Sequence, residues 1–385
     1  MYKVQVYPSI ENLHTSYKSL IDNPPKGYVF VGVSESSQRK ILKRLRSSKF
    51  LHWVYHIFLN TFKTTKILET MHSNPEFSEA DLIFATTYLY KGNKPWILNI
   101  IDSPYSLAGH RYDIFMKNKK YFESILEKEN CKKIICENEA CFKLMKLHFS
   151  KKILEKTEVV HAAITPIKFN NKTHNHPITL LFIGSINNPQ DSYQKGIVEA
   201  IEVFERLQEK YDIRLIIRCK LPPELKSKVI QNKKIALLEE LLSFEEIVKI
   251  YTSSDILIYP CHQYVLMVFL EAMYFGLPII ALDTYGTKNF IQNNVNGYVI
   301  PSSKKLQAYH APNYPLSLRT SDFFQEVKNL DINVIKELTE KVEKLIKNPT
   351  LRKRMGKEGM RIARTKFSIE TRNKKLKKIF DDALN

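Results

Sequence analysis

The chain has 385 residues, 44% of them hydrophobic, which is too long for one hydrophobic core and leads us to expect two globular domains. Its formal net charge of +19 indicates an anionic partner. The charge is spread evenly, with 25 basic and 16 acidic residues among the first 164, so the chain lacks the single basic stripe of a dedicated nucleic-acid binder.

Cysteine content and the amino terminus indicate the compartment. Five cysteines are few and odd in number, which argues against a disulfide framework and for a reducing environment. Cys131, Cys136 and Cys141 recur at intervals of five, which is not a zinc-ligand spacing, so we expect buried thiols and no metal. Residues 1–9 lack the apolar core of a signal peptide, so we expect a cytoplasmic protein.

The first 164 residues predict a doubly wound α/β domain. Buried parallel strands are indicated by apolar runs at residues 3–7, 28–33, 80–85, 94–102, 132–136 and 157–164. After the fourth run, Asp102 and His110 lie in a polar loop over residues 102–111. Ligands of open α/β sheets bind beyond the carboxyl ends of strands, so both are candidate site residues. The alternative is that the loop histidine has no function.

A basic segment runs from Arg39 to Lys66 and contains eight basic residues and no acidic one. Its aromatic residues, which include Phe50, Trp53 and Phe58, fall near one helical face. A basic amphipathic helix of this kind suits the surface of an anionic membrane. An ordinary helix that packs on its own sheet and exposes a basic side explains the pattern equally well.

Composition changes mark the rest of the domain organisation. Residues 165–177 are polar and without hydrophobic periodicity, which predicts a linker. Residues 178–366 indicate a second α/β domain, and residues 367–385 indicate a basic terminal helix. Within the second domain, the polar residues 301–329 predict a long loop or flap.

The start of the second domain carries a candidate phosphate site. A buried strand ends at Gly184 and Ser185, and Lys195 precedes a predicted helix over residues 197–209. A lysine beside the positive end of a helix suits a pyrophosphate group. Arg218 ends the next strand.

The middle of the second domain predicts a helix over residues 265–275 and a strand over residues 278–282. The acid Glu271, together with Gly276 and Pro278, argues against a transmembrane span across this apolar region. A buried carboxylate is costly without partners. Glu271 therefore either pairs locally or accepts two hydroxyls of a ribose, a role that suits an acceptor-only group.

Motifs in this region resemble a known signature. Family-4 retaining glycosyltransferases, of the glycosyl transferases group 1, carry consecutive motifs similar to LEAM at residues 270–273, GLP at residues 276–278 and NGYVI at residues 296–300. The resemblance covers most of the chain from Lys132 onward. It implies the GT-B fold, in which two Rossmann-like doubly wound domains face a cleft and the C-terminal helix returns to the N-terminal domain.

The resemblance also implies residue roles, and this chain departs from the family in the sugar site. The family has an acid pair spaced E-x7-E, of which Glu271 matches the second member and Gln263 stands at the first. In the family the first acid and nearby loop amides hold hydroxyls of the donor sugar. The family's glycine-rich loop is replaced here, so Val265 and Leu266 are the candidates for the amides.

A second departure concerns the phosphates. The family clamps the donor diphosphate with a G-R-x(n)-K-G element, which Gly184 and Lys195 match, whereas Ser185 stands at the arginine position. The change removes a bidentate phosphate donor that a lysine cannot imitate. Arg218, at the end of the strand over residues 215–218, is the candidate replacement, and the alternative is that it is solvated at the surface.

The resemblance implies a retaining glycosyltransferase, of hexosyltransferase type, that moves a sugar from a nucleotide-diphosphate sugar to a glycan or lipid-linked acceptor. Such an enzyme serves polysaccharide or glycolipid biosynthesis. We expect no metal, because the sequence contains no D-x-D motif, and no cofactor. Asp102 and His110 are expected to contact the acceptor, and the basic segment to dock on the inner face of the membrane. The alternative, permitted by the changes at positions 185 and 263, is a catalytically weak scaffold that binds a partner transferase.

Overall fold

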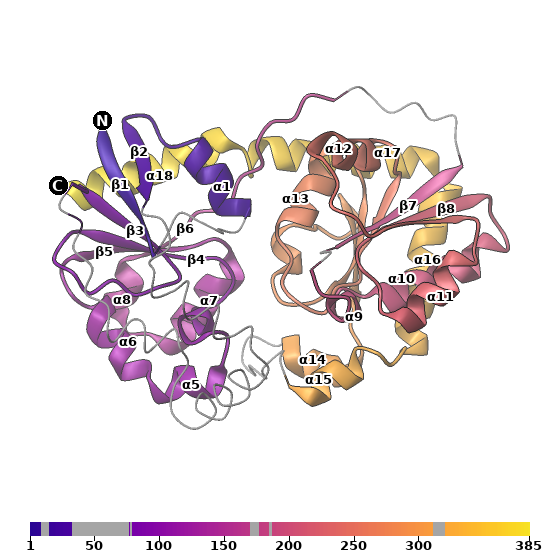
Figure 1. Ribbon diagram of the computed structural model, residues 1–385, viewed down its shortest axis with the longest axis horizontal. Coiled ribbons are helices and arrows are strands. Elements are labelled where there is room, and N and C mark those ends of the chain that lie inside the picture. Colours follow the sequence, from indigo (N-terminus) through magenta and orange to yellow (C-terminus); the bar gives the residue numbers. More distant parts are fainter. Residues whose placement is uncertain (9–14, 33–76, 78, 170–176, 185–186, 311–319) are drawn as a thin grey trace. The chain divides into compact units, whose positions relative to one another are not determined.

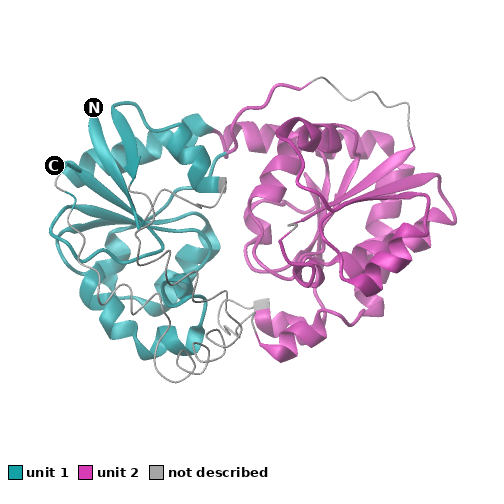
Figure 2. Cartoon of the chain, in the orientation of Figure 1, with its two compact units in different colours: residues 1–163, 369–385 teal, residues 164–368 magenta. Residues whose placement is uncertain are grey.

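The computed structural model describes residues 1–8, 15–32, 77, 79–169, 177–184, 187–310 and 320–385. The predictions for the segment from Arg39 to Lys66 and for Ser185 lie outside the described residues. The chain divides into two compact units: unit 1 comprises residues 1–163 and 369–385, and unit 2 comprises residues 164–368 (Figure 2). The stretch predicted as a linker, residues 165–177, is counted with unit 2.

Unit 1 is built on a parallel sheet of six strands in the order β2-β1-β3-β4-β5-β6. The strands are β1 (Tyr2–Tyr7), β2 (Tyr28–Gly32), β3 (Leu82–Thr86), β4 (Trp96–Ile100), β5 (Cys131–Cys136) and β6 (Thr157–Val159). Each overlaps a predicted strand, and β3 and β4 are buried along their whole length. The strand order reverses between β1 and β3, which is the switch point of this doubly wound sheet.

Helices from both ends of the chain cover this sheet (Figure 1). Those that follow strands of the unit are α1 (Thr15–Asp22), η1 (Pro104–Ala108), α5 (Tyr112–Lys117), α6 (Lys119–Leu126), α7 (Glu139–His148) and α8 (Lys151–Glu155). The side chain of Asn138 caps α7 by accepting a hydrogen bond from the backbone N–H of Cys141.

The terminal helix α18 (Ile369–Leu384) belongs to unit 1, which confirms the predicted return. Phe380 is fully buried, and its ring meets those of Phe30 and Phe84 edge-on, with centroids 6.1 and 6.2 Å away. The hydroxyl of Tyr28 donates to Oδ1 of Asp381 at 2.6 Å. Because the two ends of the chain share one core, unit 1 is complete only with α18.

Unit 2 is built on a second parallel sheet of six strands, in the order β12-β11-β10-β7-β8-β9. The strands are β7 (Ile178–Ile183), β8 (Ile213–Arg218), β9 (Ile235–Leu238), β10 (Ile256–Ile258), β11 (Ile279–Asp283) and β12 (Gly297–Pro301). The order runs outward from β7 on one side and from β10 on the other, so the switch point lies between these two strands. The loops that follow β7 and β10 are therefore where a ligand is expected.

The helices of unit 2 are α9 (Asp191–Gln194), α10 (Ile197–Gln208), α11 (Pro223–Ile230), α12 (Phe244–Thr252), α13 (Met267–Tyr274), η2 (Thr287–Asn289), α14 (Lys304–His310), α15 (Ser321–Glu326), α16 (Ile332–Lys347) and α17 (Pro349–Thr365). Helix α13 begins later than predicted, because Leu266 is its N-cap and has non-helical angles (φ −126°, ψ −78°). It is followed by Gly276 at φ +71°, the left-handed conformation expected of a glycine after a helix.

The prediction of a loop over residues 301–329 was wrong, because this stretch contains α14 and α15. Their apolar residues are few but converge, since Leu306, Phe323 and Val327 are buried in one cluster with Tyr193. This tertiary cluster, rather than a long periodic face, stabilises the two short helices. Composition alone therefore indicated a loop.

All five cysteines are buried and free, as expected. Across the described part of the chain, none of the helices combines the length and the apolar character needed to cross a membrane. Within the same residues, no three His, Cys, Asp or Glu side chains gather as a metal site would require.

Candidate functional site

The carboxyl ends of β7 and β8 bring Gly184 and Arg218 together. The two strands pair in parallel, and the backbone N–H of Gly184 donates to the carbonyl oxygen of Arg218 at 2.7 Å. Nη1 of Arg218 donates in return to the carbonyl oxygen of Gly184, also at 2.7 Å. The guanidinium is therefore held across the end of β7, beside the switch point.

Lys195 reaches the same place from the turn between α9 and α10. A Cβ added to Gly184 would lie 3.0 Å from Cδ of Lys195 and 3.7 Å from its Nζ, so the lysine side chain runs directly over this glycine. A side chain at position 184 would displace it. Burial lowers the pKa of Lys195, and the positive charge of Arg218 acts in the same direction, while Cys261 and Asp191 oppose the shift.

Nε of Arg218 is buried and has no hydrogen-bond partner among the described residues. Neither Arg218 nor Lys195 forms an ion pair with a carboxylate in this part of the chain. A buried donor on a charged group is costly when it has no acceptor, and an anion such as a diphosphate would provide one.

Glu271 lies on α13, and the structure gives it one local partner. Its Oε2 accepts a hydrogen bond from the hydroxyl of Tyr251 at 2.7 Å, and the buried ring of Tyr251 stacks on Phe275 with centroids 5.0 Å apart. Burial raises the pKa of Glu271, while the bond from Tyr251 and the charge of Arg218 oppose this. Its Oε1 has no partner among the described residues. The local-pairing interpretation thus accounts for one oxygen, and ribose binding stays a prediction for the other.

The loop over residues 261–266 carries the other predicted contacts of unit 2. Gln263 is half-buried, whereas Val265 and Leu266 are buried, so the last two can offer a ligand their backbone amides rather than their side chains. Tyr264 meets Tyr285 edge-on with ring centroids 6.1 Å apart. The loop after β10 therefore lies beside the turn after β11.

The predicted site residues of unit 1 form a pair of their own. Nδ1 of His110 lies 3.2 Å from Oδ2 of Asp102, and Asp102 also accepts a hydrogen bond from the N–H of Ser103 at 2.7 Å. Burial raises the pKa of Asp102, but His110 and the hydrogen bonds outweigh burial and hold it below its usual value. His110 has φ +63°, which is uncommon for a residue other than glycine.

A buried polar cluster near Asp102 was not predicted. Nδ2 of Asn99 donates to Oε1 of Glu137 at 2.8 Å and to the hydroxyl oxygen of Tyr17 at 3.0 Å. Burial raises the pKa of Glu137 to about 7, against the opposing effects of Asn99 and Arg372. The available signal was a polar residue within the apolar run of β4 and an acid directly after β5, at the ligand edge of the sheet.

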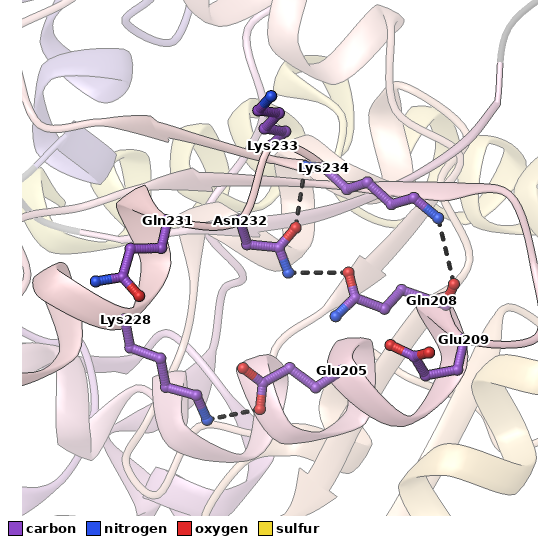
Figure 3. A pocket seen from close by; sticks show the side chains of 8 residues that line it. All are labelled: Glu205, Gln208, Glu209, Lys228, Gln231, Asn232, Lys233 and Lys234. Carbon is purple, nitrogen blue, oxygen red and sulfur yellow. Dashed lines mark hydrogen bonds and ion pairs between the residues drawn. The ribbon is translucent and has the colours of Figure 1, made fainter.

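Unit 2 also has a polar pocket of about 540 Å³, shown in Figure 3. It lies where β9 begins, at the amino ends of the strands and so away from the ligand end of the sheet. The carboxyl-terminal parts of α10 and α11 flank it. Several of its side chains are already paired: Lys228 binds Glu205 at 2.6 Å, and Asn232 donates to Gln208 at 2.9 Å. None of the predicted site residues lines this pocket.

One family model matches part of unit 2. Residues 177–311 match the family model described as Glycosyl transferases group 1, and this span contains every candidate site residue of unit 2. A search of curated protein sequences finds no match.

Solved structures resemble the chain more broadly. Alr3699/HepE of Anabaena, determined in complex with UDP-glucose, has a TM-score of 0.59 at 13% identity and covers 99% of this chain and 100% of its own. A mutant of S. aureus TarM, in complex with fondaparinux, alpha-GlcNAc-glycerol and UDP, has a TM-score of 0.52 at 16% identity and covers 78% of this chain and 55% of its own. The pneumococcal O-GlcNAc transferase GtfA, in complex with UDP and GlcNAc, has a TM-score of 0.54 at 15% identity and covers 83% of this chain and 60% of its own.

At these identities, structural likeness is evidence for the fold alone. The whole-length agreement with HepE covers both sheets and the terminal helix. The chain therefore has the two-unit α/β fold of the GT-B glycosyltransferases, and its residues 177–311 match the glycosyl transferases group 1 family.

Proposed function

We propose that the protein is a metal-independent retaining glycosyltransferase, which moves a sugar from a nucleotide-diphosphate sugar to a glycan or lipid-linked acceptor. The observation that carries this proposal is the pair of cations, Lys195 and Arg218, held over Gly184 at the switch point of unit 2. The family match over residues 177–311 supports it. HepE, TarM and GtfA were determined with UDP or UDP-glucose, so UDP-sugars are the first donors to test.

Lys195 and Arg218 bind the diphosphate of the donor. Its negative charges offset the repulsion between the two cations, and the guanidinium of Arg218 offers further N–H donors for phosphate oxygens. When the bond from the sugar to the phosphate breaks, charge develops on the leaving diphosphate, and cations already in place stabilise it. Arg218 thereby takes the role of the arginine that the family carries at the position of Ser185.

Glu271 and Gln263 orient the rest of the donor. Oε1 of Glu271 accepts hydrogen bonds from the ribose hydroxyls, while its Oε2 stays with Tyr251. Gln263 both donates and accepts hydrogen bonds, so it holds sugar hydroxyls with a preference that differs from that of an acid. The amides of Val265 and Leu266 complete this side of the site.

The configuration of the sugar is retained because the acceptor attacks the same face of the sugar from which the diphosphate departs. The acceptor hydroxyl forms the new bond to the anomeric carbon while the bond to the phosphate oxygen breaks, and that oxygen takes the hydroxyl proton. No side chain acts as a nucleophile. The protein contributes the positions of donor and acceptor and the stabilisation of the diphosphate.

Unit 1 binds the acceptor, with Asp102 and His110 as its contacts. The pair lies after β4, at the ligand end of the sheet, which supports this assignment. The basic segment from Arg39 to Lys66 docks the enzyme on the inner face of an anionic membrane, where lipid-linked acceptors are found. This last step rests on the sequence alone.

The test is turnover of a donor panel. The purified protein is incubated with UDP-, GDP- and ADP-sugars, with and without a lipid-linked glycan extract, and release of the nucleoside diphosphate is measured. We expect the wild type to release the nucleoside diphosphate from one donor class, and the variant Lys195→Met to release almost none. Mass spectrometry of nucleotides retained on the purified protein identifies the class independently.

A second candidate is a catalytically weak scaffold that binds a partner transferase. It is favoured by Gln263, which lacks the charge of the family's first acid, and by Ser185. A scaffold of this kind predicts no release from any donor in the panel, even where a nucleotide binds.

A further inference from the structure

A buried pair of titratable side chains lies directly beside the proposed diphosphate site. Nε2 of His262 is 2.7 Å from Oε1 of Glu199, and their side chains are 2% and 5% exposed. His262 immediately precedes Gln263 in the loop after β10, and Glu199 is in the first turn of α10, four residues beyond Lys195. The pair therefore connects the two segments that carry Lys195 and Gln263.

The same two segments are also joined through the backbone. The carbonyl oxygen of Gln194 accepts a hydrogen bond from the N–H of His262 at 2.8 Å and one from Sγ of Cys261 at 3.4 Å. Gly196 has φ +80°, and a Cβ there would lie 2.2 Å from the carbonyl oxygen of Pro260. Both neighbours of Lys195 in the chain are thus fixed to the loop after β10.

Burial of Glu199 and His262 costs more free energy than a purely structural role would justify. Oε2 of Glu199 is buried and has no hydrogen-bond partner among the described residues. A buried polar pair of this kind is seldom more stabilising than apolar residues of the same volume, and its best-attested use is to fix one arrangement among alternatives. Here the arrangement in question is the position of the turn that carries Lys195.

We propose that Glu199 and His262 are positioning residues, which hold the turn 194–196 against the loop after β10 so that Lys195 reaches the diphosphate. The inference rests on the proposed function, because it assigns a purpose to Lys195. Neither residue touches the donor. Their removal therefore weakens the contact made by Lys195 and leaves the contacts to the nucleoside unchanged.

The test compares a nucleoside diphosphate with its nucleoside. UDP, GDP and ADP are titrated against the wild type by calorimetry, and the tightest of them, together with the matching nucleoside, is titrated against the variants. We expect His262→Ala and Glu199→Ala to weaken binding of the diphosphate by about tenfold or more. This is the effect on affinity of losing one charge-assisted hydrogen bond. The affinity for the nucleoside should stay the same, and Glu199→Gln, which keeps an acceptor for His262, should bind as the wild type does.

A double-mutant cycle with Lys195 separates positioning from a general loss of order. In the background of Lys195→Met, His262→Ala should have no further effect on diphosphate affinity, because the contact it supports is already gone. The control is His148→Ala in unit 1, a buried histidine bonded to the hydroxyl of Tyr105 at 2.9 Å. It should lower thermal stability without changing nucleotide affinity.

Each other outcome is decisive. If the wild type binds no nucleoside diphosphate, the proposed function itself fails. If the wild type binds one and His262→Ala binds it equally well, loses nucleoside and diphosphate affinity alike, or adds its full effect to Lys195→Met, only the positioning role is overturned. If His262→Ala and Glu199→Ala both fail to fold, the pair is a folding element and the inference is wrong.

Discussion

Lys195 and Arg218 are two positive side chains placed over one glycine, and neither has an ion-pair partner in the described part of the chain. The positive charge of Arg218 disfavours that of Lys195, and a cation partly withdrawn from water in a structural cluster is normally paired. The arrangement is therefore better explained by a bound anion than by a contribution to stability. A diphosphate carries enough charge and enough acceptors for both residues.

Arg218 is the residue whose proposed role departs most from the pattern of the resembled family. Replacing Arg218 by Met should lower kcat/KM for the donor by about 10- to 100-fold, because a charge-assisted hydrogen bond is worth about 1.5–3 kcal/mol. Arg218→Lys should recover little of this, since a point charge does not reproduce the guanidinium fork. Steady-state kinetics with the active donor measures both, and Lys228→Met in the pocket of Figure 3 is the control. Unchanged kinetics in Arg218→Met would remove Arg218 from the site.

The two interpretations of Glu271 can be separated by treating its oxygens independently. Glu271→Gln should weaken nucleotide-sugar binding by about 1–3 kcal/mol, because the amide is uncharged and the bonds to the ribose are no longer charge-assisted. Tyr251→Phe removes only the local partner of Oε2 and should lower thermal stability with a smaller change in affinity. Calorimetric titration and thermal unfolding of both variants provide the comparison. If both variants lose stability and neither loses affinity, Glu271 is a structural residue.

Glu137 makes the stability of unit 1 depend on pH. Its pKa rises from 4.5 to about 7 on folding, chiefly through burial, so the folded state holds the proton more tightly across this window. The contribution of Glu137 to the free energy of unfolding is therefore largest below pH 4.5 and falls as the pH rises to 7. A shift of this size corresponds to about 3 kcal/mol.

Glu137→Gln should remove that dependence, because the amide does not titrate. Urea unfolding between about pH 5 and pH 8 measures it, with the exposed Glu155→Gln in α8 as the control. A wild-type slope that persists in Glu137→Gln would assign the pH dependence to another group.

At the scale of elements, the sequence predicted most strands, because parallel strands buried on both faces are continuous apolar runs. The strand β9 was not predicted, because its residues 235–238 are mostly half-buried at the edge of the sheet and lack that signature. The helices α14 and α15 were not predicted, because a tertiary cluster stabilises them. Helix α12 carries a local start signal, because Ser243 and Glu246 form a full capping box.

The candidate residues were named from the sequence, but the contacts between them were not. Lys195 and Glu271 stand in motifs, whereas the bond from Arg218 to Gly184 depends on which strands pair and in which register. Likewise, the partner of Glu271 is Tyr251, which comes from a different helix. Those contacts are long-range, and no local pattern in the sequence specifies them.

The helix α18 is expected to act as part of the core of unit 1. Phe380→Ala should destabilise the protein by about 3–5 kcal/mol, because it leaves a cavity among the rings of Phe30 and Phe84. Phe244→Ala in α12 is the matched control, since Phe244 is 59% exposed and its loss should cost less than about 0.5 kcal/mol. Chemical denaturation of the two variants gives the comparison, and equal effects would mean that α18 contributes little to the core.

At the scale of the whole molecule, the candidate contacts are divided between the units. The residues proposed for the donor, Lys195, Arg218, Gln263 and Glu271, all belong to unit 2, and those proposed for the acceptor, Asp102 and His110, belong to unit 1. Both sets lie after strands, at the ligand ends of their sheets. Agreement with HepE over 99% of this chain indicates that the chain contains both units of that fold.

Binding of a nucleoside diphosphate through Lys195 is the central claim, and calorimetric titration of UDP, GDP and ADP, each against its nucleoside, tests it most directly. We expect the wild type to prefer one diphosphate over the nucleoside by at least about 100-fold, and Lys195→Met to lose most of that preference while still binding the nucleoside. A wild type that binds no nucleoside diphosphate, or a Lys195→Met variant that binds it as tightly as the wild type, would contradict the claim.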